Sequence, residues 1–460
     1  MKYVSTRGDA PVLGFSDVLL AGLAADGGLY MPEEWPTLTQ PSTARTYVER
    51  AVEVMLPFVE PDIDELTLTH LATEAYSTFR HPAVVPLVQI DHNQWVQELF
   101  HGPTLAFKDV ALQLVGKLFD HVLAQRGERV TIVGATSGDT GSAAIDGVLG
   151  CENIDIVILY PLGRTSDVQR KQMTTVDAPN VHAVAVEGTF DDCQDMVKAM
   201  FNDVEFRQRN QLSAVNSINW ARVMAQTVYY VTASEMFDEP VTFSVPTGNF
   251  GNVLAGWIAR KMGAPIRDFI ISSNTNDILT RFINDNDMSA RAVIPSLSPS
   301  MDIQVSSNFE RLLFEMNGRD GGMTAEQMRR FRATGKLLIE PDQRATFLSG
   351  SIRAAAFDDA RTLAEIKRVY DATGGYVVEP HTATATAAAR MLSANDGGGP
   401  VITLATAHPA KFPDAVEQAT GFRPELPAHL ADLFDREERT QTVANDLATV
   451  QALVEELTAR

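Results

Sequence analysis

The chain has 460 residues, 45% of them hydrophobic and 21% charged, which is typical of a globular protein with two or three domains. Its formal net charge of −21 argues against a nucleic-acid or anionic-membrane surface, so neither partner is expected. Two cysteines are too few for a disulfide framework, and nine histidines without an HExxH pattern predict no metal site.

The first apolar run, residues 18–25, follows an acidic residue and precedes Asp26-Gly27-Gly28. We expect a short helix here, with Ser16 as its N-cap and glycines at its end. The segment lacks the basic start of a secretory signal, and no apolar run is long enough to span a membrane. We therefore expect a cytoplasmic protein.

An alternation of β-branched runs and helical stretches predicts an α/β fold. Strands are expected at residues 129–134, 154–160, 181–186, 241–245, 268–272 and 401–404. Helices are expected at residues 143–149, 166–176, 190–203, 218–237 and 252–262, followed by a charged helical tail at 430–460. Such alternation indicates parallel sheets, in which ligands bind in the loops that follow the strands.

Residues 101–109, HGPTLAFKD, place Lys108 after apolar residues and at the start of a largely apolar stretch. A lysine buried in such a setting has a depressed pKa, and its amine can form a Schiff base. Lysines at helix starts are more often solvated surface charges. This feature alone therefore leaves both interpretations open.

Two loops could hold an anion. Residues 134–141, GATSGDTG, supply glycines and hydroxyls at a helix start, although an ordinary capped turn has the same composition. Residues 245–252, VPTGNFGN, lack dinucleotide and P-loop patterns but suit one phosphate monoester, with a structural turn as an equal alternative. We expect His381 and His408 to be hydrogen-bonded structural residues.

Read in chain order, these segments closely resemble the threonine synthase family, in its longer, cytosolic type. The resemblance is carried by TRG at 6–8, GLAADGGLY at 22–30, the three loops above, NSINWAR at 216–222 and TAHPAKF at 406–412. It implies the type II fold of pyridoxal-phosphate enzymes, which resembles the tryptophan synthase β subunit: two α/β domains with parallel-rich sheets, plus an N-terminal extension. We expect an N-terminal domain over 1–90, a large cofactor-binding domain over 91–128 and 238–460, and a small domain over 129–237.

The resemblance also implies the site. Lys108 would carry pyridoxal 5'-phosphate as a Schiff base, and Thr406 would face the ring nitrogen. A neutral hydroxyl there would not stabilise a protonated ring. The cofactor phosphate would be cradled by Gly248, Asn249, Phe250, Gly251 and Asn252. The substrate and the cofactor's phenolic oxygen would be bordered by Thr136, Ser137, Asp139 and Thr140, and the substrate phosphate held by Asn216, Ser217 and Arg222.

One position departs from related dehydratases and cysteine synthases, many of which have Asn where this chain has Asp139. An ionised carboxylate would repel the phenolate, so the partner of the ring oxygen stays open. The activity implied is conversion of O-phospho-L-homoserine and water to L-threonine and phosphate, by a monomer or homodimer. A phospho-lyase that gives 2-oxobutyrate is the alternative, and a non-catalytic ligand-binding module is a further one.

Overall fold

The computed structural model describes residues 1–136, 138–214, 217–348, 351–393 and 399–459. They form two compact units: Met1–His101 with Ser217–Pro424 (unit 1), and Gly102–Asn216 with Glu425–Arg460 (unit 2). This grouping differs from the three expected domains, because helix α4 (Lys108–Arg126) packs on α5 (Asp139–Gly147), whereas α9 (Trp220–Ser234) packs on α2 and α10. The three-domain division stays a prediction.

Unit 1 is built on a six-stranded sheet in the order β13-β10-β9-β14-β4-β3. Its strands are β3 (Leu87–Asp91), β4 (Gln94–Glu98), β9 (Val241–Pro246), β10 (Ile266–Ser273), β13 (Ile352–Ala356) and β14 (Val401–Ala405). All pairs are parallel except β3 with β4. Every residue of β9 and β14 is buried, which explains why both strands are continuous apolar or small-residue runs.

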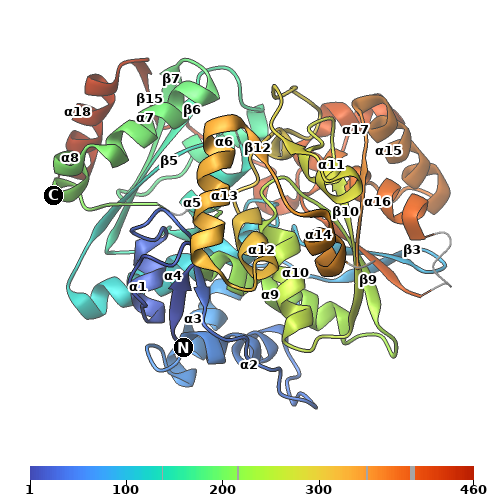
Figure 1. Ribbon diagram of the computed structural model, residues 1–460. Helices are drawn as coiled ribbons and strands as arrows, with labels where there is room; N and C mark the ends of the chain where they lie inside the picture. Colours follow the sequence, from blue (N-terminus) through green and yellow to red (C-terminus); the bar gives the residue numbers. More distant parts are fainter. Residues whose placement is uncertain (137, 215–216, 349–350, 394–398, 460) are drawn as a thin grey trace. The chain divides into compact units, whose positions relative to one another are not determined.

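Helices and short strands surround this sheet (Figure 1), and α16 (Pro380–Ser393) packs against β9, β10 and β14. The other helices of unit 1 are α1 (Phe15–Ala21), α2 (Tyr47–Val59), α3 (Glu65–Tyr76), α10 (Gly251–Lys261), α11 (Ile278–Asp285), α12 (Phe309–Met316), α13 (Gly321–Thr334), α14 (Pro341–Leu348), α15 (Asp359–Thr373) and α17 (Pro413–Thr420). Two small antiparallel sheets join β1 (Tyr3–Ser5) to β2 (Tyr30–Pro32), and β11 (Met288–Ser289) to β12 (Lys336–Leu337).

Unit 2 has a five-stranded, all-parallel sheet in the order β15-β7-β6-β5-β8. Its strands are β5 (Val130–Ala135), β6 (Ile154–Pro161), β7 (Val181–Glu187), β8 (Leu212–Ser213) and β15 (Thr440–Ala444). Besides α4 and α5, its helices are α6 (Asp167–Thr174), α7 (Phe190–Asn202), α8 (Val204–Arg209) and α18 (Leu447–Thr458). The six strands expected from the sequence are all confirmed across the two units, with ends that shift by at most about two residues.

Two local expectations are wrong. Helix α1 begins at Phe15 with Gly14 as its N-cap, and Ser16 lies inside its first turn. The capping acceptor comes from a distant residue, because the Asp62 carboxylate accepts from the Ser16 N–H at 2.7 Å. The tail over residues 430–460 is not helical throughout. It adds strand β15 to the edge of the unit 2 sheet before α18 begins.

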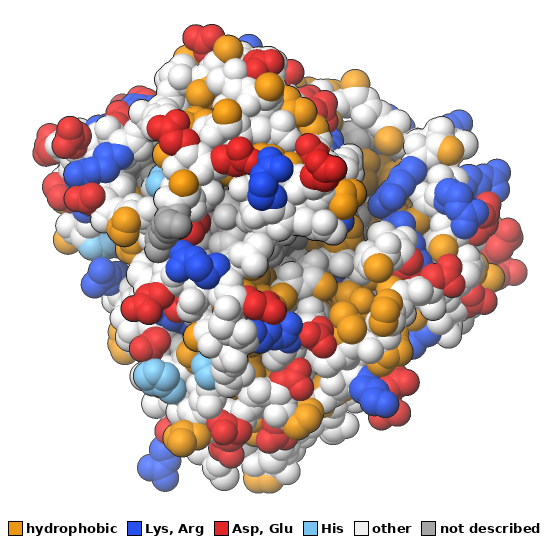
Figure 2. All heavy atoms as spheres, turned by 90° about the vertical axis from the view of Figure 1, so that its left-hand side faces the viewer, with side chains coloured by type: hydrophobic (Ala, Val, Ile, Leu, Met, Phe, Trp, Pro, Cys, Tyr) orange, Lys and Arg blue, Asp and Glu red, His pale blue; other side chains and the backbone are white. Residues whose placement is uncertain are grey.

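The distribution of charged side chains, the two cysteines and the hydropathy of the helices can be compared with the amino-acid composition. Acidic and basic side chains are interspersed over the face seen in Figure 2, which shows no single basic patch. Cys151 and Cys193 are both buried and form no disulfide. In the part of the chain that the structure describes, no helix is long and apolar enough to cross a membrane.

Candidate active site

Lys108 is the first residue of α4 and is only 8% exposed, so it is not the solvated surface lysine that the sequence left possible. The buried carboxylate of Asp109 orders the preceding loop, since it accepts from the Thr104 N–H at 2.9 Å and the Thr104 hydroxyl at 2.5 Å. Gly102 is required beside it, because a Cβ there would lie 2.5 Å from the Asp109 side chain. The loop thus fixes where the amine emerges.

Asp139 lies close to that amine. Its Oδ2 is 3.9 Å from Lys108 Nζ, and its Oδ1 accepts a hydrogen bond from Gln169 Nε2 at 2.8 Å. Both members of the pair are buried, so their attraction is screened far less than that of a surface pair. Gln169, on α6, was missed from the sequence. The one sequence feature connected with Gln169 is the glycine at position 138. Any larger residue there would clash, because a Cβ would lie 2.3 Å from the Gln169 amide nitrogen.

The rest of the 134–141 loop is an ordered turn. Thr136 Oγ1 accepts from the N–H groups of Gly138 and Gly141, each at 3.0 Å, so this hydroxyl braces the start of α5. Thr140 is half-buried in the first turn of α5. Ser137 lies outside the described residues. The contacts of Thr136 are therefore those of an ordinary capped turn, which was the alternative to an anion-binding loop.

The 245–252 loop links β9 to α10 in unit 1. Its carbonyls are engaged: Gly248 O accepts from Ser306 Oγ at 2.8 Å, and Asn249 O accepts from the Asn308 N–H at 3.1 Å. Phe250, at φ +62°, turns the chain into the helix. Within the described ranges, no protein group accepts from the N–H groups of Gly248, Asn249 and Phe250. Successive N–H groups left open at a helix N-terminus form a cradle for an anion.

Asn252 adds an oriented donor to this loop. The residue is 5% exposed, and its Oδ1 accepts from Tyr229 OH at 2.5 Å and Tyr230 OH at 2.8 Å. Burial raises the pKa of both phenols well above 10, so they remain donors. The Nδ2 of Asn252 is buried and finds no acceptor among the described residues. An unsatisfied buried donor costs about 1–3 kcal/mol, which a bound anion would offset.

Arg222 lies in the first turn of α9 and is 3% exposed. Its Nε and one terminal nitrogen are buried and have no hydrogen-bond partner in the described part of the chain. Burial lowers its pKa to about 10, which still leaves a cation at neutral pH. Ser217 precedes it and is half-buried, with its carbonyl accepting from Asn308 Nδ2 at 2.9 Å. Asn216 lies outside the described residues.

Asn308 therefore contacts two of the predicted site segments, through Ser217 O and Asn249 O. Thr406, directly after β14, is 7% exposed, and its hydroxyl is 3.5 Å from the Glu379 carboxylate. His381 and His408 are hydrogen-bonded, as expected: His381 contacts Glu379, and His408 Nδ1 accepts from the Ala410 N–H. Neither Asn308 nor Glu379 was identified from the sequence.

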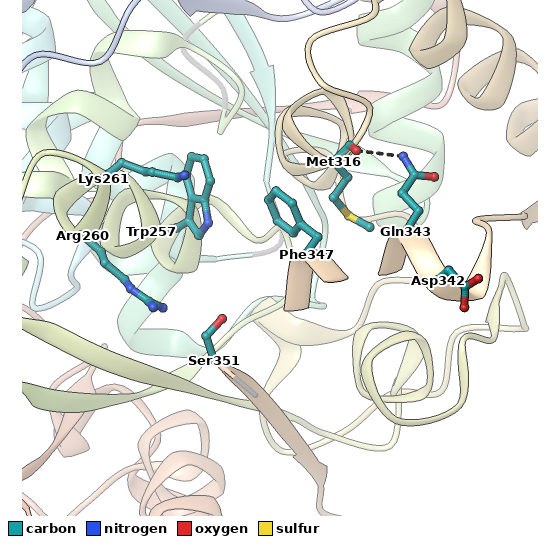
Figure 3. A pocket seen from close by; sticks show the side chains of 8 residues that line it. All are labelled: Trp257, Arg260, Lys261, Met316, Asp342, Gln343, Phe347 and Ser351. Carbon is teal, nitrogen blue, oxygen red and sulfur yellow. Dashed lines mark hydrogen bonds between the residues drawn. The ribbon is translucent and has the colours of Figure 1, made fainter. Parts of the chain in front are cut away.

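The structure thus brings Lys108 and Asp139 together in unit 2. In unit 1 it links the Ser217 segment to the 245–252 loop. A separate cavity of about 690 Å³ opens beside the C-terminal end of α10 (Figure 3). It is lined by Trp257, Arg260, Lys261, Met316, Asp342, Gln343, Phe347 and Ser351. No predicted site residue lines it, so it is not the candidate active site. Among the described residues, no group of three His, Cys, Asp or Glu could hold a metal ion.

These features define a class. A buried lysine at a helix start, an anion cradle at a second helix start and parallel α/β sheets are what a pyridoxal-phosphate enzyme needs. Residues 79–348 match the family described as pyridoxal-phosphate dependent enzyme, which confirms the expected fold class and cofactor. Residues 2–76 match the threonine synthase N terminus, and residues 382–454 match the threonine synthase C-terminal region.

Full-length relatives identify the family within that class. The threonine synthase of Pseudomonas aeruginosa is 54% identical over 99% of this chain and 98% of its own, and that of Saccharomyces cerevisiae is 39% identical over 100% and 98%. The crystal structure of pyridoxal-phosphate-bound threonine synthase from Brucella melitensis superposes with a TM-score of 0.97 at 51% identity, covering 100% of both chains. The yeast threonine synthase structure gives 0.94 at 38% identity, over 100% of this chain and 99% of its own. The chain belongs to the threonine synthase family.

Proposed function

We propose that this enzyme converts O-phospho-L-homoserine and water into L-threonine and phosphate, the last step of threonine biosynthesis. The observation that carries the proposal is Arg222, a buried cation with two guanidinium nitrogens that no described protein group satisfies. Keeping such a group buried is costly unless a ligand pairs with it. A planar guanidinium suits the two oxygens of a phosphate, and the substrate's phosphate is the group that must leave.

The remaining predicted residues take roles by their chemistry. Lys108 holds pyridoxal phosphate, and the open N–H groups of the 245–252 loop bind the cofactor phosphate, together with Asn252 Nδ2. Gly251 allows close approach there, because a Cβ would lie 3.1 Å from Asn308 Nδ2. Thr406 faces the ring nitrogen. The substrate is bordered by Thr136, Ser137, Asp139 and Thr140, and its phosphate is held by Asn216, Ser217 and Arg222.

When bound, pyridoxal phosphate supplies an electron sink for the carbanion formed at the substrate's Cα. The chain supplies the proton transfers. The Lys108 amine would take the Cα proton of the substrate, and the Asp139 carboxylate, 3.9 Å from that amine, would stabilise the ammonium that results. Gln169 keeps that carboxylate in place through its 2.8 Å hydrogen bond. Arg222 neutralises charge on the phosphate as it departs from Cγ.

The test is an absorbance spectrum of the purified protein before and after addition of O-phosphohomoserine, with products assayed. We expect a visible band that changes with substrate, together with threonine and phosphate in equal amounts. Lys108→Ala removes both, whereas Lys117→Ala, on the same helix α4, leaves both in place. Formation of 2-oxobutyrate instead of threonine would identify a phospho-lyase. A wild-type protein that develops no visible band with added cofactor would overturn the site assignment.

We further propose that the enzyme works in the cytoplasm as a monomer or homodimer. The cytoplasmic part of this proposal is supported by the resemblance to the longer, cytosolic type of threonine synthase. Light scattering on the purified protein measures the mass of the assembly. A mass above that of two chains would overturn the second part of this proposal.

A further inference from the structure

Asn308 is a fully buried residue at the start of α12. An asparagine or aspartate in this position ordinarily caps its own helix with a side-chain oxygen, as Asp320 does at the start of α13. Asn308 makes no such cap. Its Oδ1 accepts from Arg311 Nη1 at 2.5 Å, and its Nδ2 donates to Ser217 O at 2.9 Å, 91 residues away. Its amide nitrogen therefore serves a distant segment, as residues of functional sites often do.

The main chain of Asn308 contacts a different segment, the 245–252 loop. The Asn308 N–H donates to Asn249 O at 3.1 Å. Ser306, two residues earlier, donates its hydroxyl to Gly248 O at 2.8 Å. Neither bond uses the Asn308 side chain. A substitution of that side chain therefore leaves both attachments of the 245–252 loop in place.

The two segments meet at Gly251, the first residue of α10. A Cβ there would lie 3.1 Å from Asn308 Nδ2 and 3.9 Å from Ser217 O. The glycine thus leaves room for the hydrogen bond between Asn308 and Ser217 directly beside the start of α10. Arg311 adds a second tie, because its Nη2 donates to Ile218 O at 2.7 Å. Two successive carbonyls, those of residues 217 and 218, are held from α12.

Arg222 follows these carbonyls within about one helical turn. Helix α9 begins at Trp220, and the Arg222 N–H donates to Asn219 O at 3.2 Å. The Nε and one terminal nitrogen of Arg222 find no partner among the described residues, so hydrogen bonds of these two atoms do not fix the guanidinium. Its place depends on the backbone that leads into α9. A small displacement of a group that holds a substrate is costly for catalysis.

We propose that Asn308 is a positioning residue for the substrate's phosphate, because it holds segment 217–222 in place relative to the 245–252 loop. The inference rests on the function proposed above, in which the first segment holds the substrate phosphate and the second the cofactor phosphate. The substrate must reach from the cofactor at its Cα end to Arg222 at its phosphate end. The distance between the two segments sets that reach. Asn308 contacts one segment with its side chain and the other with its main chain.

The test separates the two contacts of Asn308. Asn308→Leu has nearly the same shape and no polar group, so it removes the bond to Ser217 O and keeps the main-chain bond to Asn249 O. We expect KM for O-phosphohomoserine and the inhibition constant of inorganic phosphate to rise together, each about tenfold, since a buried carbonyl loses its donor and the segment shifts. The dissociation constant of pyridoxal phosphate, measured from its visible band, should stay at the wild-type value.

Asn317→Leu is the matched control, because Asn317 lies at the other end of α12. Its side chain also both donates and accepts, with Thr324 Oγ1 at 2.9 Å and Gln343 Nε2 at 2.9 Å. We expect this variant to lose stability while KM and the inhibition constant of phosphate stay at their wild-type values. Equal rises in the two variants would assign the effect to a general loosening of α12 and would overturn the inference.

If Asn308→Leu does not fold, Asn308→Ser decides the matter. A serine is a good residue for the start of a helix, and it is too short to make the 2.9 Å contact with Ser217 O, so both constants should rise again. Wild-type values of both constants in a folded variant overturn the inference, as does a change confined to the dissociation constant of the cofactor. A wild type that neither consumes O-phosphohomoserine nor is inhibited by phosphate overturns the proposed function instead.

Discussion

Arg222 and Arg311 are both almost completely buried in unit 1, yet their surroundings differ. Arg311, on α12, donates to Tyr30 O at 3.1 and 2.9 Å, to Ile218 O at 2.7 Å and to Asn308 Oδ1 at 2.5 Å. Arg222 leaves its Nε and one terminal nitrogen without a partner in the described part of the chain. Burial lowers the pKa of both, to about 9 for Arg311 and about 10 for Arg222.

The difference separates a structural arginine from a ligand-binding one. Arg311 ties the N-terminal segment and the start of the Ser217 segment to α12, so its hydrogen bonds offset the cost of its burial. Arg222 has the same cost without that compensation. Burial alone therefore does not reveal function. The informative observation is which donors remain unsatisfied.

Replacing Arg222 should have the largest effect on activity. We expect Arg222→Leu to lower kcat/KM for O-phosphohomoserine by about 30- to 5,000-fold, since removing a buried, charged phosphate partner costs roughly 2–5 kcal/mol. Its free energy of unfolding should be equal to or above that of the wild type, because an unpaired buried charge is removed. Steady-state kinetics and urea unfolding measure the two quantities. Arg222→Lys with wild-type kinetics would contradict the bidentate role.

Arg311→Leu should show the opposite pattern. It leaves three oxygen acceptors without a donor, at about 1 kcal/mol each, so we expect the free energy of unfolding to fall by about 3 kcal/mol. Activity per folded molecule should fall far less than in Arg222→Leu. Urea unfolding combined with active-site titration separates stability from turnover. Equal stability losses in the two variants would remove the distinction drawn here.

Binding of inorganic phosphate should depend on Arg222. Phosphate that binds the folded protein at 10–100 times its Kd stabilises it by about 1.4–2.7 kcal/mol. We expect a rise in Tm for the wild type that is reduced in Arg222→Leu and retained in the exposed-site control Arg329→Leu.

Because the pKa of Arg222 is lowered to about 10, the cation that binds phosphate is present below that pH and lost above it. The Arg222-dependent part of the Tm shift should therefore disappear as pH rises through about 10. A shift that survives at higher pH would assign the binding elsewhere.

Much of the fold could be predicted from the sequence because its central strands are buried on both faces. Strands such as β6 and β9 appear as continuous apolar or small-residue runs. Strand β15 was missed since it is a mostly exposed edge strand, whose polar pattern gives no sign of its pairing with β7. The prediction of Ser16 as an N-cap was wrong for a similar reason. The Ser16 N–H at the start of α1 donates to Asp62, which is distant in sequence.

The residues of the candidate site also divide into those that the sequence suggested and those that it did not. The local sequence left the burial of Lys108 open and made an anion-binding loop at residues 245–252 only as probable as a structural turn, so the family resemblance was needed for both. Arg222 was suggested only by family resemblance, because nothing in the local sequence shows that its donors lack partners. Gln169 could not be found at all. It contacts Asp139, 30 positions away, through a hydrogen bond that no local pattern encodes.

The smallest effect should come from Gln169, whose amide holds the Asp139 carboxylate beside Lys108. We expect Gln169→Leu to lower kcat about five- to tenfold, the equivalent of about 1 kcal/mol for one lost hydrogen bond, with KM little changed. Gln113→Leu is the matched control, because Gln113 Nε2 also donates to a carboxylate, that of Asp146, at 2.6 Å within unit 2. Both variants should lose similar stability, since each removes a hydrogen bond from a buried glutamine amide to a carboxylate. Only Gln169→Leu should slow turnover, because only Gln169 contacts the partner of Lys108. An equal loss of kcat in the two variants would mean that Asp139 is held well enough without Gln169, and that the effect on rate is one of general stability.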